Sequence, residues 1–257
     1  MSQSEVSGSR APEINEVSFA DLRDSLAAGW RDFTRAPLYG MGFALVYVLG
    51  GWLVFWALTT KGQLWWTLPA SAGFPILGPF IAVGFYEISR RLEAGLPLDW
   101  PGIAGVILRE RNRQIPSMAA VIVIFFLFWN FLAHMIFALF LGTMSLTNIT
   151  SSLEVFATPN GLMMLAIGTA LGAVIATLLF GLTVVSLPLL LDREVDFVTA
   201  MLTSLGLVMA NPLVMLSWGA LVAGLLFLAM LPGFLGLFVV LPVLGHATWH
   251  LYRRALS

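Results

Sequence analysis

Long apolar stretches alternate with short charged segments along the whole chain. Residues 37–60 and 114–153 contain no Asp, Glu, Lys or Arg. An uncharged apolar run of about 18 residues or more is long enough to cross the hydrocarbon core of a membrane as a helix. We therefore expect six transmembrane helices, at about residues 38–60, 64–89, 117–142, 161–191, 213–230 and 233–251.

The charged segments recur in a fixed order. Each one precedes a helix-stopping proline and an apolar stretch long enough for two spans, and the segments are 18–36 before Pro37, 99–115 before Pro116, and 196–211 before Pro212. In the first segment Leu22, Leu26 and Phe33 fall near helical spacing between charged residues. Such segments either lie in the membrane interface with the apolar face down, or cap the helix bundle.

The pattern predicts an all-α membrane protein with one domain over residues 18–257. Its six transmembrane helices form three helical hairpins, each preceded by a cytoplasmic amphipathic segment, with internal repeats at 18–98, 99–195 and 196–257. Residues 1–17 are polar and acidic, and we expect them to form a disordered cytoplasmic tail.

Composition supports the membrane assignment and predicts its orientation. Hydrophobic residues make up 59% of the chain and charged residues 11%, against about 25% charged in a soluble domain. With six spans, Lys61 lies alone on one side of the membrane. The other side holds Arg10, Arg23, Arg31, Arg35, Arg90, Arg91, Arg109, Arg111, Arg113, Arg193, Arg253 and Arg254. Basic residues collect on the cytoplasmic side, so both termini are expected there.

Charge and cysteine content exclude several kinds of function. The net charge of −1 argues against nucleic-acid binding. The chain has no cysteine, so it can supply no disulfide, thiolate zinc site or iron–sulfur ligand. We find no catalytic motif, and we expect a protein that is not an enzyme and has no catalytic residue and no metal site.

Two polar groups of residues are candidate sites. His246 and His250 share one face of a helix at i and i+4, a spacing that a haem or a quinone could use. The other interpretation is a hydrogen-bonded polar cluster at the cytoplasmic end, in which Glu87 forms local ion pairs at i+3 and i+4. That cluster comprises Glu87, Arg90, Arg91, His246, His250, Arg253 and Arg254.

The second candidate is an intramembrane polar pair. Asn130 and His134 lie four residues apart within the third expected span. Hydrogen bonding between helices is the ordinary use of such residues. The small number of polar side chains in the spans argues against an ion-coupled transporter.

Several motifs resemble a known family. They are residues 29–33 and 36–40, 72–75 and 78–80, 86–91, 186–188 and 191–193, 211–212, and 245–254. Together they are similar to the bacterial integral membrane family known as domain of unknown function 2189, over roughly Phe19 to Leu256. This resemblance implies a multi-pass protein of the bacterial inner (cytoplasmic) membrane, and it implies no established activity.

Three hypotheses for the function remain. The first is a non-catalytic accessory, assembly or scaffold subunit of a larger membrane complex, for example a respiratory or photosynthetic one. Its partners would be the lipid bilayer and other membrane-protein subunits, without nucleic acid or cofactor. The second is a transporter or channel for a small apolar or lipid-like solute, based on the repeats and on spans interrupted by proline. The third is a haem- or quinone-binding membrane protein that uses His246 and His250.

Overall fold

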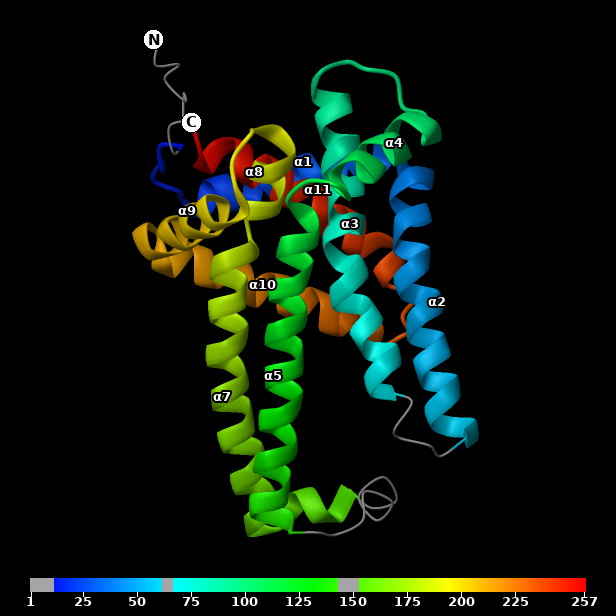
Figure 1. Cartoon of the computed structure of the whole chain (residues 1–257), viewed down its shortest axis with the longest axis vertical. Coiled ribbons are helices and arrows are strands. Elements are labelled where there is room, and N and C mark those ends of the chain that lie inside the picture. Colours follow the sequence, from blue (N-terminus) through cyan, green and yellow to red (C-terminus); the bar gives the residue numbers. More distant parts are fainter. Residues whose placement is uncertain (1–11, 62–66, 143–152) are drawn as a thin grey trace, which may run out of the picture.

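The computed structural model describes residues 12–61, 67–142 and 153–257. These residues are almost entirely helical, and their only β pairing is an isolated bridge between Ile14 and Leu256 (Figure 1). The elements are α1 (Phe19–Arg35), α2 (Pro37–Lys61), α3 (Thr67–Glu93), α4 (Trp100–Glu110), α5 (Ile115–Leu141), η2 (Leu153–Ala157), α7 (Pro159–Thr183), α8 (Ser186–Asp192), α9 (Phe197–Ala210), α10 (Pro212–Met230) and α11 (Leu237–Ala255).

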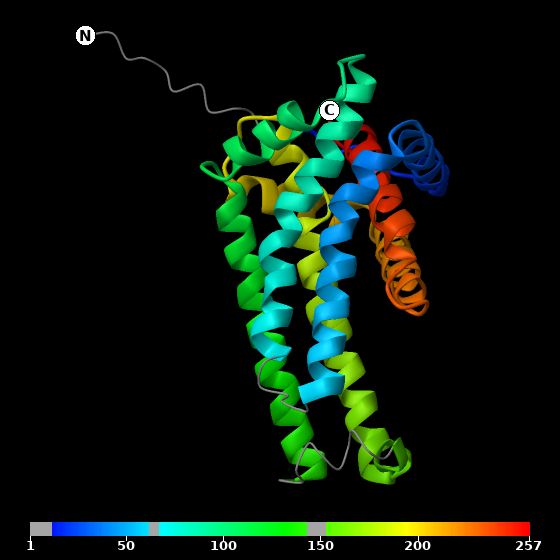
Figure 2. The same cartoon turned by 90° about the vertical axis from the view of Figure 1, so that its right-hand side faces the viewer.

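Four helices run along the long axis of the molecule. Figures 1 and 2 show α2, α3, α5 and α7 side by side in this direction, with α3 in contact with both α2 and α5, and α5 in contact with α7. Helices long and apolar enough to cross a membrane cover Pro37–Trp56, Ile115–Leu141, Pro159–Asp192 and Pro212–Met230 in the part of the chain that the structure describes. The chain is therefore an all-α membrane protein.

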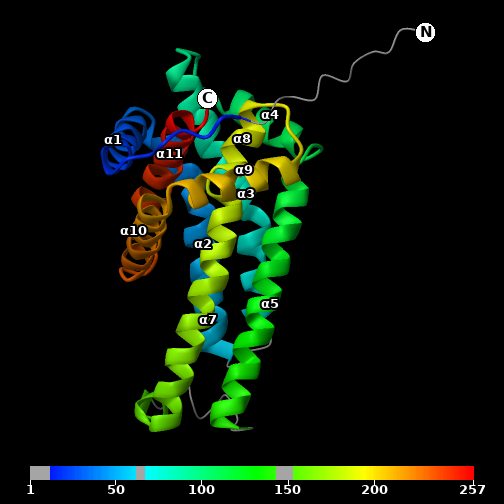
Figure 3. The same cartoon turned by 90° about the vertical axis from the view of Figure 1, so that its left-hand side faces the viewer.

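Each of the three charged segments forms a helix that begins at a side-chain cap. Ser18, Asp99 and Asp196 accept a hydrogen bond from the backbone N–H three residues later, at the starts of α1, α4 and α9. Such caps satisfy one of the N–H groups that a helix start leaves unpaired. The three helices gather at one end of the four long helices (Figure 3), which we call the charged end.

The last hairpin, α10–α11, differs from the six-span prediction. Its turn contains Gly233 and Phe234, both with positive φ, and the Gly233 carbonyl accepts a hydrogen bond of 2.7 Å from Trp52 Nε1. Trp52 lies 15 residues after Pro37, about 22 Å along α2 at 1.5 Å per residue. The turn therefore reaches only the middle of α2, and Figure 2 shows the hairpin ending partway along the long helices. The six predicted spans are therefore not confirmed, because the length of a helix does not by itself determine how the helix is tilted across the membrane.

The N-terminal segment is held against the body of the protein from residue 13 onward. Backbone hydrogen bonds join Glu13 to Ser257 and Asn15 to Ala255, and the Val17 N–H donates to Asn211 Oδ1 at 2.9 Å. The expected disordered tail over residues 1–17 is therefore wrong for this part, because paired backbone groups order it. The first eleven residues lie outside the described part of the chain.

The buried core lies near the charged end. Its largest wholly buried side chains include Trp218, Trp249 and Tyr252, from α10 and α11. By contrast, only 6% of the most apolar 18-residue stretch of α5 is buried within the protein. The charged end is thus a packed polar and apolar assembly, and much of α5 faces its surroundings.

Candidate functional site

The predicted polar cluster lies at the charged end, where Glu87 is at its centre on α3. The Glu87 side chain is 0% exposed. It accepts hydrogen bonds of 2.7 and 3.0 Å from Arg90 and of 2.7 Å from Arg91. Arg91 continues to Asp99 Oδ2 at 3.1 Å, and Asp99 caps α4. The ion pairs expected at i+3 and i+4 are present within α3, and the contact of Arg91 with Asp99 joins the end of α3 to the start of α4.

His246 is buried between α11 and α3. Its Nδ1 lies 2.8 Å from Ser89 Oγ and 3.1 Å from the Phe85 carbonyl oxygen. A carbonyl can only accept, so the bond to Phe85 requires the proton on Nδ1. Nε2 is then a bare acceptor, and it has no partner among the described residues. His246 therefore binds α11 to the backbone of α3.

His250 has a different partner, which the sequence analysis did not identify. Its Nε2 lies 2.7 Å from Asp32 Oδ2, and the Asp32 side chain is only 8% exposed. Burial acts to raise the pKa of Asp32, but hydrogen bonds from His250 and Ser89 outweigh it, so this pKa lies below its ordinary value. The position of Asp32 on the inner face of α1 was the available signal, but no spacing rule connects residues 32 and 250.

The two C-terminal arginines of the cluster lie at its rim. Arg253 reaches Asp192 at 3.4 Å and Glu93 at 3.5 Å, and Arg254 reaches Asp21 at 3.4 Å. Tyr252 also donates to Asp192, at 2.6 Å. These three acidic partners were not predicted, because each belongs to an element far away in the chain.

The predicted cluster is therefore four separate groups of polar contacts in one region. Glu87 binds its own arginines, and it forms no hydrogen bond with either histidine in the described structure. The contacts cross-link α1, α3, α4, α8 and α11. No group of three or more His, Asp or Glu side chains that could hold a metal occurs within the described ranges.

The predicted pair Asn130 and His134 does not form a bond between helices. Asn130 Nδ2 donates to the Phe126 carbonyl at 2.8 Å, and His134 Nδ1 lies 2.7 Å from the Asn130 carbonyl. Both side chains thus bond to the backbone of their own helix, four residues back. His134 is exposed on α5.

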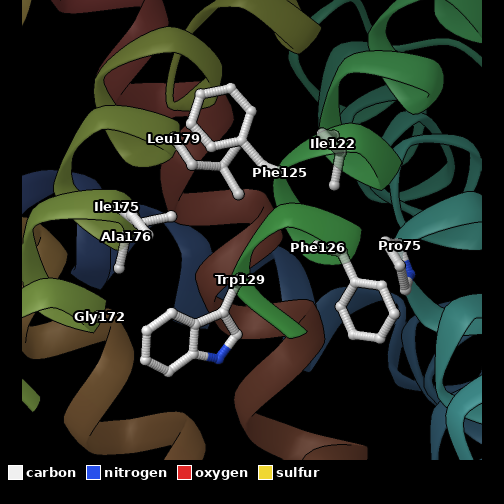
Figure 4. A pocket seen from close by; sticks show the side chains of 9 residues that line it. All are labelled: Pro75, Ile122, Phe125, Phe126, Trp129, Gly172, Ile175, Ala176 and Leu179. Atoms are coloured by element: carbon white, nitrogen blue, oxygen red, sulfur yellow. The ribbon is translucent and has the colours of Figure 1, made fainter. Parts of the chain in front are cut away.

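An apolar groove lies among α3, α5 and α7, and sequence analysis did not predict it. Its volume is about 420 Å³ (Figure 4). The lining residues are Pro75, Ile122, Phe125, Phe126, Trp129, Gly172, Ile175, Ala176 and Leu179. A second cavity of about 360 Å³ shares Trp129 and Gly172 with the first and continues toward Gly168.

Comparison with known proteins identifies the middle of the chain. A family model described as a predicted integral membrane protein, DUF2189, matches residues 67–192. This region runs from α3 to α8 and contains Glu87, Arg90 and Arg91, whereas His246 and His250 lie outside it. The expected membrane family is confirmed over this region, which is shorter than the resemblance at Phe19–Leu256. No match was found among curated proteins or among solved structures.

Proposed function

We propose that this chain, whose residues 67–192 belong to the DUF2189 family of predicted integral membrane proteins, is a non-catalytic subunit of a larger membrane complex. In this role it serves as an accessory, assembly or scaffold subunit in a bacterial inner membrane, with both termini cytoplasmic. Its partners are other membrane-protein subunits. The proposal depends on which surface of the long helices the protein leaves uncovered.

An exposed apolar stripe on α5 is the observation that carries the proposal. Large side chains recur at helical spacing along one face of this helix, and more than half of each is exposed: Ile124 63%, Phe128 56%, Phe131 67%, Met135 51% and Leu139 77%. The α5 side chains that line the groove, such as Phe125 and Trp129, lie at other positions of the same helix. We call the five exposed residues the α5 stripe.

The α5 stripe matches the requirements of a contact between membrane helices. Such contacts depend on close van der Waals packing, because lipid tails are as apolar as the side chains. Side chains that recur every three or four residues present one continuous face to a partner helix. The stripe occupies the middle and far half of α5, away from the charged end, so it suits a transmembrane helix of another subunit.

Basic side chains at the charged end offer a second contact surface on the same subunit. Arg31, Arg35, Arg109 and Arg111 are exposed, and none of them forms an ion pair with another described residue. They are available to an acidic cytoplasmic segment of a partner or to anionic lipid. This surface supports the proposal only together with the α5 stripe.

The test is photocrosslinking in the native membrane. A photoreactive phenylalanine analogue replaces Phe131 in the α5 stripe or, as the matched control, Phe227, which is 60% exposed on α10. We expect a discrete crosslinked membrane protein from position 131, identifiable by mass spectrometry, and none from position 227. The double variant Phe128→Ala with Phe131→Ala should lose co-purification of that protein in mild detergent. Only lipid adducts from position 131, with a single protein recovered, would refute the proposal.

A second candidate is a carrier for a small lipid-like solute. The groove between α3, α5 and α7 supports it, since carriers need an apolar cavity within the bilayer. Uptake or lipid content that differs between an intact and a deleted strain, with no crosslinked partner, would favour this function over the first.

Haem binding by His246 and His250 would require some of their present hydrogen bonds to break. His250 Nε2 is bonded to Asp32, and His246 Nδ1 is bonded within α3. Iron ligation through His250 Nε2 would break the contact with Asp32. An absorbance spectrum of the purified protein tests this hypothesis directly.

A further inference from the structure

The middle of α5 carries a tryptophan with an unsatisfied hydrogen-bond donor. Trp129 lies 14 residues after Ile115, about 21 Å along a 27-residue helix. Its indole N–H donates to no other described residue. Trp129 is half-buried, and water that could accept its hydrogen bond is scarce in the hydrocarbon region.

A tryptophan at a similar depth in α2 has an internal acceptor for its indole N–H. Trp52 lies 15 residues into α2, and its Nε1 donates to the Gly233 carbonyl at 2.7 Å. Both indoles therefore lie near the middle of a long helix that starts at the charged end. Unlike the N–H of Trp52, which has an internal carbonyl as acceptor, the N–H of Trp129 is open to an acceptor from outside the chain.

Trp129 is part of the wall of the α3–α5–α7 groove. Figure 4 shows its indole ring between α7 and α3, with the nitrogen on the side turned toward Phe126. Phe125 and Phe126 add two more aromatic rings to the same wall, and Pro75 lies opposite on α3. A cavity of about 420 Å³ falls within the range of small-molecule sites.

Gly172 makes the room for this arrangement. A Cβ atom added to Gly172 would lie 2.9 Å from the Trp129 ring at Cη2, whereas one added to Gly168 would meet nothing within 4 Å. The two glycines are one helical turn apart on α7, so they form a matched pair for testing the site.

From these features we infer that the groove binds a lipid-soluble quinone, with the ring among the aromatic side chains and a ring carbonyl accepting the Trp129 hydrogen bond. The aromatic wall suits a flat ring, and the groove is apolar enough for a hydrocarbon tail. Ester carbonyls of phospholipids lie near the membrane interface, whereas Trp129 lies about 21 Å from the charged end. This inference concerns a different surface from the α5 stripe and does not depend on the proposed function.

Equilibrium binding to the full chain in lipid nanodiscs tests the inference. The probe is decylubiquinone, and two matched probes are decylbenzene, which lacks the carbonyls, and methyl laurate, an acyl ester. We expect saturable binding of decylubiquinone and at least tenfold weaker binding of the other two. Equal binding of decylbenzene would overturn carbonyl recognition, and equal binding of methyl laurate would overturn selection of the ring.

Four single substitutions test whether decylubiquinone binds in this groove. Trp129→Phe should weaken decylubiquinone binding about tenfold, as expected for one lost hydrogen bond, whereas Trp52→Phe should leave it unchanged. Gly172→Ala should also weaken binding, and Gly168→Ala should not. All four variants must first elute in size-exclusion chromatography as the parent protein does. Binding that is unaffected by both Trp129→Phe and Gly172→Ala, or an azido-quinone label outside α3, α5 and α7, would overturn the inference.

Discussion

At the scale of single residues, burial gives the ion pairs of Glu87 a larger structural role than surface ion pairs have. An ion pair at i+3 or i+4 on a helix surface contributes a few tenths of a kcal/mol. Glu87 is instead 0% exposed, and Arg91 is only 14% exposed. Removing one partner of a buried pair leaves the other charge uncompensated. The carboxylate is therefore a structural centre of the charged end.

We predict that Glu87→Gln lowers the free energy of unfolding by about 3 kcal/mol, because Arg90 and Arg91 lose the negative charge they share and one of its two acceptor oxygens. Unfolding by SDS in mixed micelles, followed by circular dichroism, measures this change.

The control for Glu87→Gln is Asp24→Asn. Asp24 pairs with Arg23 at 3.5 Å, but the two side chains are 47% and 82% exposed. The expected loss is below about 1 kcal/mol. Equal effects of the two substitutions would contradict a structural role for burial at Glu87.

At the scale of elements, α1 packs closely against α11. A Cβ atom on Gly29 would lie 2.5 Å from the Val243 carbonyl oxygen and 2.6 Å from the Ala247 nitrogen, both backbone atoms of α11. Backbone cannot yield as a flexible side chain does. The absence of a side chain at Gly29 therefore lets α1 approach close enough for the bond between Asp32 and His250.

We predict that Gly29→Ala separates α1 from α11 and lowers the free energy of unfolding by about 2 kcal/mol. The same SDS titration measures it. Gly105→Ala in α4 is the control, since a Cβ there meets nothing within 4 Å. This control should be neutral or stabilising by up to about 1 kcal/mol, because alanine favours helix more than glycine does. A Gly29→Ala protein as stable as the control would show that the helices tolerate the separation.

At the scale of the whole molecule, the α10–α11 hairpin decides how many helices cross the membrane. Its turn is bonded to the middle of α2 through Trp52, although α10 alone is long enough to span. Irregular backbone at membrane depth needs its polar groups satisfied within the protein, and the Gly233 carbonyl has the Trp52 indole as its donor. We therefore expect this hairpin to enter the bilayer from the charged end and return to the same side.

Cysteine labelling in intact cells tests this topology, and the chain contains no native cysteine to interfere. Asn160→Cys at the start of α7 should react with a membrane-impermeant maleimide added outside. Asn112→Cys at the charged end should react only after the cells are opened. Leu231→Cys in the hairpin turn should stay unlabelled by this reagent in both conditions. Labelling of Leu231→Cys from outside would instead establish two full spans.

Local chemistry determined most of the secondary structure. Ser18, Asp99 and Asp196 are capping residues, and Pro37 and Pro212 begin long helices, so the starts of α1, α2, α4, α9 and α10 could be predicted from neighbouring residues. The ion pairs of Glu87 with Arg90 and Arg91 were also predictable, because all three residues lie within one helical turn. The segregation of charge identified a membrane protein, since the hydrocarbon core excludes charge.

Only the tertiary structure decided the contacts between distant segments. The pairing of Asp32 with His250, the close approach at Gly29 and the shared groove at Trp129 and Gly172 join residues that no periodicity relates. The depth that the last hairpin reaches was also decided by tertiary structure, because the tilt of the hairpin follows from packing of Phe234 and Gly233 against α2. Helix formation depends on interactions over three or four residues, whereas helix placement depends on which surfaces fit together.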